Sequence, residues 1–262
     1  MILMNVGVFK KETIDHLSAK QLDINSEVNY SDKVDKAKVL WGNKSKKHFS
    51  EVRIILDSMC VGSRRCNYCE DSVADEVEHI KPKNIYPECC FLSDNYLYSC
   101  GPCNGPKNDF YAVLDVNGNV VEVSRGKNSP VVPPQGGVDV LINPRVEDPL
   151  EYIILDFNTF LFTAMPGKTA EEIERAKYTI KILGLNSRDY LINARKHAFS
   201  SYLDSLELYV RKKQEGVEND ELLARKHELS RRHHPTIWHE MKRQRNSYQK
   251  LQGLFNQAAE LL

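Results

Sequence analysis

The sequence predicts an α+β protein in which a small, cysteine-rich module lies between segments that are mostly helical. Three observations predict this class. Apolar residues recur at helical spacing towards both ends of the chain, all seven cysteines fall between residues 60 and 103, and two β-rich runs flank an Asn-Gly pair. These features divide the chain into segments 1–59, 60–115, 116–165 and 166–262.

The first segment, residues 1–59, is expected to be helical. Its stretch HFSEVRIILDSM places several apolar side chains on one face of a helix, a spacing that buries one stripe of the helix surface. These side chains belong to Phe49, Val52, Ile55, Leu56 and Met59.

The segment 116–165 combines a turn, a linker and a strand. Asn117-Gly118 between β-rich runs predicts a hairpin, because Asn-Gly is the strongest short hairpin signal. The Pro- and Gly-rich stretch 129–137 indicates a linker. LEYIILDF, residues 150–157, predicts a short buried strand.

The segment 166–262 is expected to be helical. Thr169 and Glu172 predict a capping box, and Gly184 should end the helix that follows it. Two more helices are expected over about 187–213 and from residue 219, and Pro235 precedes a last helix. This last helix would carry Trp238, Met241, Tyr248, Leu251, Phe255 and Ala258.

The amino-acid composition excludes few classes of function. The chain carries 36 basic and 36 acidic residues, and a balanced charge leaves a nucleic-acid partner open, because binding depends on where the positive charges lie. No apolar run reaches membrane-spanning length, and the first residues do not form a secretory signal. We therefore expect no membrane partner and a cytoplasmic location.

The cysteines form two Cys-x-x-Cys pairs, CNYC at 66–69 and CGPC at 100–103. Two such pairs complete a tetrahedral Zn²⁺ site, and four thiolates leave no open position for catalysis, so the zinc would be structural. The alternatives are a redox pair, which usually occurs singly near a βαβ unit, or ordinary buried thiols. We expect Cys66, Cys69, Cys100 and Cys103 to bind zinc, and Cys60, Cys89 and Cys90 to be small buried residues.

Polar residues with catalytic potential lie between and just after these pairs. Phosphodiester hydrolysis needs an activated water and a cation that balances the developing charge. A neutral His79 can accept the proton of that water, and the neighbouring Glu78 can bind a hard divalent cation if the strand ends and twists there. Lys107 should lie one helical turn after Asn104, on the same face.

This order of residues resembles the HNH nuclease family, over EHIKP (78–82), DNYLYSC (94–100) and CNGPK (103–107). The resemblance implies a zinc-stapled ββα-metal core within residues 60–115. It also implies an endonuclease whose substrate is DNA in preference to RNA and whose products carry a 3′-hydroxyl and a 5′-phosphate. It implies that His79 is the general base and that Asn95 is structural and holds His79 in place. Asn104 would join Glu78 in binding the catalytic Mg²⁺ or Mn²⁺, and Lys107 would steady a substrate phosphate.

The chain departs from the pattern of many relatives at two positions. Glu78 stands where aspartate is common, and Asn104 stands where others carry histidine. One carboxylate and one amide make a weak protein site for Mg²⁺, which borrows oxygens from water and substrate. We therefore expect the catalytic metal site to be empty or poorly filled without nucleic acid.

A second resemblance covers residues 60–200 and includes LINPRVEDPLEYIILDF and TIKILGLNSRDYLINAR. These stretches look like the HNH subunits of Septu-type and retron-linked bacterial defence systems. The resemblance implies a role in anti-phage defence and an ATPase partner protein.

Other interpretations remain open. A single histidine is more often structural than catalytic, so the chain could be a zinc-stabilised nucleic-acid-binding module or a scaffold subunit that does not cut. The basic stretches 225–245 and 43–48 could contact phosphates, or they could be solvated helix faces.

Overall fold

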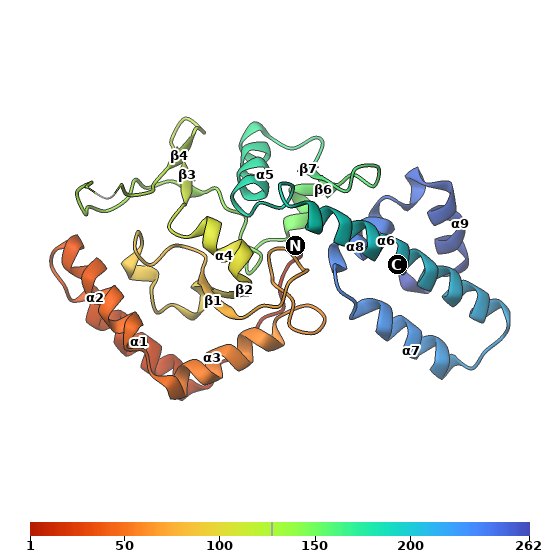
Figure 1. Ribbon diagram of the computed structural model, residues 1–262, viewed down its shortest axis with the longest axis horizontal. Helices are drawn as coiled ribbons and strands as arrows, with labels where there is room; N and C mark the ends of the chain where they lie inside the picture. Colours follow the sequence, from red (N-terminus) through yellow and green to blue (C-terminus); the bar gives the residue numbers. More distant parts are fainter. Residues whose placement is uncertain (127) are drawn as a thin grey trace.

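The computed structural model describes residues 1–126 and 128–262; residue 127, inside the segment predicted over 116–165, lies outside the described residues. Within that range the protein is a mixture of helices and small sheets, as the sequence predicts. Helices occupy both ends of the long axis and the small sheets lie between them (Figure 1).

Three helices lie between residues 11 and 58, in the segment for which helical structure was expected. Residues 1–10 are not helical, and Met4 N–H donates to the carbonyl of Pro144. Ser45 caps the third helix through its side chain, and that helix buries Phe49, Val52 and Leu56 on one face. The helices are α1 (Lys11–Asn25), α2 (Tyr30–Gly42) and α3 (Lys46–Ser58).

The centre of the molecule holds an antiparallel pair of strands, β1 (Glu76–His79) and β2 (Tyr96–Ser99), followed directly by the short helix α4 (Gly101–Lys107). In the register of this pair, Glu76 lies opposite Ser99 and His79 opposite Tyr96. Helix α3 packs near β2, and α4 packs on β1, so the pair lies between helices (Figure 1).

The expected hairpin and strand are present in the middle of the chain. Gly118 turns between β3 and β4 with a φ of 78°, in the left-handed region that glycine tolerates. A two-residue strand at the end of the predicted linker joins this sheet, and LEYIILDF supplies one strand of a separate pair. The strands are β3 (Ala112–Leu114), β4 (Val120–Glu122), β5 (Val138–Asp139), β6 (Ile153–Leu155) and β7 (Phe162–Ala164).

The remaining chain is helical, and the capping box between Thr169 and Glu172 is confirmed. Gly184 follows the capped helix with a φ of 56°. The expected last helix is instead two helices with a 3₁₀ turn over Arg245–Ser247 between them. The helices are α5 (Ala170–Ile182), α6 (Asp189–Gln214), α7 (Asn219–Ser230), α8 (Pro235–Arg243) and α9 (Gln249–Gln257).

The break after α8 has a local cause. Gln244 donates to the carbonyl of Leu155 at 2.8 Å, and Glu240 accepts from the Leu155 amide at 3.2 Å. The last turn of α8 is therefore bonded to the backbone of β6, and the chain changes direction before α9 begins.

One large cluster of buried side chains extends from Met1 to Leu261 and includes the four cysteines of the Cys-x-x-Cys pairs. The N-terminal helices, the central strands and the C-terminal helices thus share a core. Within residues 1–126 and 128–262, no helix combines the length and the apolar character that crossing a bilayer requires.

Candidate metal centre and active site

Two loops bring the four cysteines of the predicted zinc site together. Cys66 and Cys69 lie between α3 and β1, Cys100 directly precedes α4, and Cys103 lies in its first turn. All four side chains are buried, and their sulfur atoms lie within 4.8 Å of one another.

The spacing of these thiols suits a tetrahedral ion. The Sγ atoms of Cys69 and Cys100 are 3.8 Å apart. Bonds of 2.3 Å to zinc in tetrahedral geometry separate neighbouring sulfurs by about 3.8 Å. The cluster can therefore hold a structural metal such as zinc, and its four sulfur donors would leave no position open to substrate.

Residues from the C-terminal half contact Cys103 of the second pair and Glu70, the neighbour of the first pair. Arg188 Nη2, just before α6, lies 3.2 Å from Cys103 Sγ. Glu70, which follows Cys69, accepts hydrogen bonds from both the backbone N–H and the hydroxyl of Thr236 in α8. The positive charge of Arg188 suits a four-thiolate zinc site, whose net charge is negative.

The other three cysteines lie outside the cluster. Cys90 is buried, whereas Cys60 and Cys89 are half-buried. Burial raises the pKa of Cys60 to about 12, that of Cys89 to about 11 and that of Cys90 to about 12, so all three remain protonated thiols near neutral pH.

The two faces of β1 meet different partners. Side chains alternate along a strand, so Glu76 and Glu78 share one face and His79 lies on the other. The glutamate face lies against α4, where Asn104 and Lys107 are one turn apart. The His79 face meets Trp41 at the end of α2.

Glu78 and Lys107 form a buried ion pair. Lys107 Nζ lies 2.5 Å from Glu78 Oε1, with the two side chains 1% and 5% exposed respectively, and it also donates to the carbonyl of His79 at 2.9 Å. Burial raises the pKa of Glu78, and the charge of Lys107 opposes that shift. Lys107, expected to steady a phosphate, is enclosed and neutralises Glu78 instead.

Asn104 is bonded to a different glutamate from the one expected. Its Nδ2 donates to Glu76 Oε2 at 2.6 Å, and both side chains are half-buried. Sequence reasoning missed Glu76, although its position two residues before Glu78 in a strand was a usable signal. Glu78 and Asn104, expected to bind the catalytic Mg²⁺ or Mn²⁺ together, are bonded to Lys107 and Glu76 respectively, and their joint binding of a metal stays a prediction.

The imidazole of His79 is held by a backbone carbonyl. Nε2 lies 2.9 Å from the carbonyl oxygen of Cys90, which can only accept, so Nε2 carries the proton and Nδ1 carries the lone pair. The ring packs edge-on against Trp41 and Tyr96, with centroid distances of 4.3 and 5.2 Å.

His79 is kept neutral. Burial, and then the positive charge of Lys83, lowers the pKa of His79 to about 3. Among the described residues Nδ1 has no hydrogen-bond partner. The atom is not fully buried. Nδ1 is therefore a free acceptor at the margin of the core.

Asn95 connects the loops around His79. Its Oδ1 accepts from the Lys81 amide at 2.7 Å, and its Nδ2 donates to the carbonyls of Lys81 and Cys89 at 2.9 Å each. These bonds fix the chain two residues after His79 and directly before Cys90, whose carbonyl orients the ring.

The structure thus separates residues that the sequence analysis had grouped. His79 faces the N-terminal helices, while Glu78 lies on the opposite side of β1, towards α4 and its residue Asn104. Among residues 1–126 and 128–262, the four cysteines alone form a group of three or more His, Cys, Asp or Glu side chains able to hold a metal. On the α4 side of β1, Glu78 pairs with Lys107 and Asn104 donates to Glu76.

The basic stretch 225–245 is partly neutralised by its own helices. Arg225 pairs with Glu221 at 2.7 Å, and Arg232 pairs with Glu228 at 2.5 Å. Such internal pairs reduce the positive charge that this surface offers to a phosphate.

Comparison with known proteins gives a partial match. No family model matches the chain. A Bacillus thuringiensis protein named Septu protein PtuB is 28% identical over 152 residues, which are 56% of this chain and 46% of that protein. The matched region therefore covers more than half of this chain but less than half the length of this curated relative.

Proposed function

We propose that this protein is an HNH-type endonuclease that hydrolyses phosphodiester bonds of nucleic acid, DNA in preference to RNA, in bacterial anti-phage defence. The observation that carries the proposal is the state of His79, whose Nε2 is fixed by the Cys90 carbonyl while Nδ1 has no hydrogen-bond partner in the described part of the chain. The succession of β1, β2 and α4, with one cysteine pair before β1 and the other where β2 leads into α4, supports the same reading.

The chemistry assigned to His79 is proton removal. A neutral imidazole accepts the proton of an attacking water through its lone pair, and the hydrogen bond to Cys90 stabilises the imidazolium that results. Asn95 positions both sides of this arrangement through its three bonds to the backbone. Asn95 is therefore a positioning residue in this proposal.

A divalent cation belongs to the proposal on chemical grounds. Phosphodiester hydrolysis needs a positive charge to balance the transition state, and Mg²⁺ or Mn²⁺ supplies it in most such enzymes. Glu76 and Asn104 offer oxygen donors, but on the face of β1 opposite His79. The cleavage assay with Mg²⁺, Mn²⁺ and a chelator therefore tests whether cutting depends on the metal.

Cleavage of plasmid DNA tests the proposal. The wild type and His79→Ala are compared with Mg²⁺, with Mn²⁺ and with a chelator, in the presence of the neighbouring gene product as a candidate partner. We expect the wild type to cut with a divalent cation, and His79→Ala to lose about 100-fold or more of the rate, the contribution typical of a general base. His197→Ala, at an exposed histidine of α6, serves as the matched control.

Two outcomes would contradict this proposal. Equal cutting by the wild type and His79→Ala would remove His79 from the reaction. Binding of DNA by both proteins with cutting by neither would favour a nucleic-acid-binding module, an alternative supported by the enclosure of Glu78 and Lys107 in an ion pair.

The defence role rests on the similarity to the Septu protein. The resemblance to Septu-type and retron-linked systems would add an ATPase as the partner protein. Co-purification from cells that express the neighbouring genes tests this point, and recovery of the chain alone would count against it.

A further inference from the structure

A half-buried tryptophan connects His79 to two lysines. The Trp41 ring lies 4.3 Å from the His79 ring, measured between centroids. Lys44 Nζ lies 4.8 Å and Lys83 Nζ 5.9 Å from the Trp41 centroid. Lys44 belongs to the connection between α2 and α3, and Lys83 follows β1, so two separate segments place ammonium groups near the proposed base.

Among residues 1–126 and 128–262 these ammonium groups have no acidic partner. Most other buried or half-buried lysines pair with a carboxylate, as Lys81 does with Asp139 at 2.9 Å. Within the described residues Lys44 donates to the Trp41 carbonyl at 3.3 Å, and neither Lys44 nor Lys83 forms a salt bridge. Positive charge gathered without a counter-charge favours an anionic ligand.

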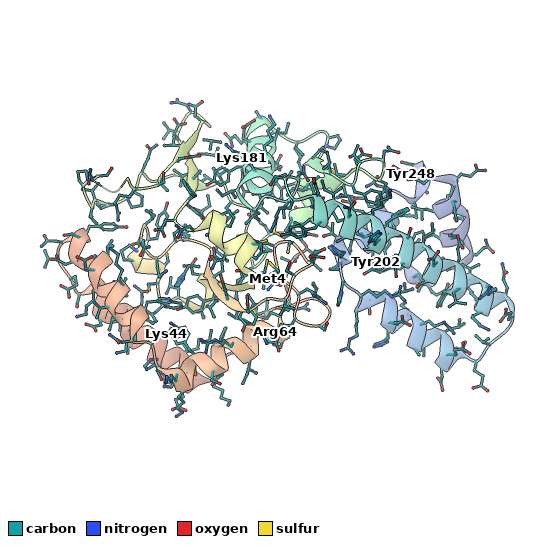
Figure 2. The ribbon with its side chains drawn as sticks, viewed as in Figure 1. Met4, Lys44, Arg64, Lys181, Tyr202 and Tyr248 are labelled. Carbon is teal, nitrogen blue, oxygen red and sulfur yellow. The ribbon has the colours of Figure 1, made fainter. Side chains whose placement is uncertain are left out.

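The surroundings add positive charge. After burial, the charges of Arg53 and Lys83 are the largest causes that lower the pKa of Lys44, which shows that these groups lie close enough to repel one another. Arg53 is exposed on α3. Figure 2 places Lys44 over the region where α2 and α3 meet, at the lower left of the molecule.

We propose that Lys44 and Lys83, seated on Trp41, bind the phosphate backbone of the nucleic acid beside His79. This inference rests on the proposed function and names the residues that hold its substrate. Lys107 is enclosed with Glu78 and cannot reach a phosphate in this structure. Lys44 and Lys83 take over the role that the sequence analysis had given to Lys107.

The geometry favours backbone contact over base recognition. An ammonium is a compact point charge that binds phosphate without reading sequence. The Trp41 ring already carries the two ammonium groups and packs against His79, Phe49 and Tyr96, so it is not a free stacking surface for a base.

The test measures DNA binding by Lys44→Gln/Lys83→Gln with a labelled duplex and a chelator, from about 50 to about 200 mM salt. Each lost phosphate contact lowers the slope of log K against log salt by about 0.9. For the Lys44/Lys83 variant we therefore expect the magnitude of this negative slope to decrease by about 2 and the affinity for DNA to decrease by about tenfold or more. The loss should be the same for duplexes of unrelated sequence. Zinc content and thermal unfolding verify that the variant folds.

Lys181→Gln/Lys196→Gln is the matched control, because it removes the same charge from exposed positions on α5 and α6; Figure 2 shows Lys181 far from Lys44. The control should bind DNA as the wild type does. An unchanged slope in the Lys44/Lys83 variant, an equal loss in the control, or a wild type that binds no nucleic acid would each overturn the inference.

The binding and cleavage assays separate this inference from the proposed function. If the wild type cuts DNA and the Lys44/Lys83 variant keeps its KM and salt slope, the inference fails alone. If nothing cuts but the variant loses its slope, the phosphate site stands and the nuclease proposal fails.

Discussion

Lys107 Nζ lies 2.5 Å from Glu78 Oε1 in the core between β1 and α4. Lys107 also donates to the His79 carbonyl, so the pair ties α4 to the end of β1. Substituting one member leaves the other charge buried without a counter-charge, whereas substituting both leaves no buried charge.

Lys107→Met should therefore lower the free energy of unfolding by about 3–5 kcal/mol, because Glu78 loses its counter-charge. Glu78→Gln/Lys107→Met should recover a large part of this loss. Urea unfolding of the wild type, both single variants and the double variant measures the coupling. Additive losses in the double variant would mean that the two charges do not stabilise each other.

Zinc should be present in the purified protein and should depend on the four clustered cysteines. Cys103→Ser should lose the metal and unfold at a lower temperature, because a structural zinc contributes directly to folding. Elemental analysis and thermal unfolding measure both effects. Cys89→Ser, outside the cluster, should retain zinc; equal loss in the two variants would contradict the assignment.

Arg188 should strengthen metal binding through Cys103. Arg188→Leu removes the positive group 3.2 Å from that sulfur, and partners of metal ligands typically change affinity by about 10- to 100-fold. Competition with a chromogenic chelator measures the affinity. Arg188→Lys should retain part of the effect if charge matters, and a Leu variant with wild-type affinity would exclude this role.

His79 should make stability fall in mild acid. Its folded pKa is about 3 and its ordinary value is 6.5, so between these values the unfolded chain binds the proton more strongly. The contribution is fully present above pH 6.5 and is lost progressively as the pH falls towards 3, by up to about 1.4 kcal/mol per unit.

His79→Gln should show a weaker loss of stability over this range, since glutamine does not titrate there. Chemical unfolding of both proteins across the same pH series is the measurement. Identical pH dependence in the two proteins would mean that His79 titrates normally in the folded state.

Local sequence patterns predicted local structure well. Asn-Gly at Gly118, the capping box at Thr169 and the two Cys-x-x-Cys pairs are each decided within a few residues, by turn conformation, backbone capping or ligand reach. The fold class, a mixture of helices and small sheets around a four-cysteine cluster, followed from them.

Partner choice within the site could not be predicted in the same way. Whether Asn104 meets Glu76 or Glu78, and whether Lys107 faces water or the core, depends on how α4 is rotated against β1. That rotation is set by packing over the whole molecule. The contact of Trp41 with His79 also depends on tertiary packing, because it joins α2 to β1. No short sequence pattern predicts it.

The contacts of Thr236 with Glu70 and of Arg188 with Cys103 join distant stretches of chain to the two halves of one sulfur cage. An ion in that cage would close the polypeptide into a loop without a covalent link. A protease nick near the exposed Leu92, which lies between Cys69 and Cys100, should then leave two pieces that the ion helps to hold together until a chelator removes it.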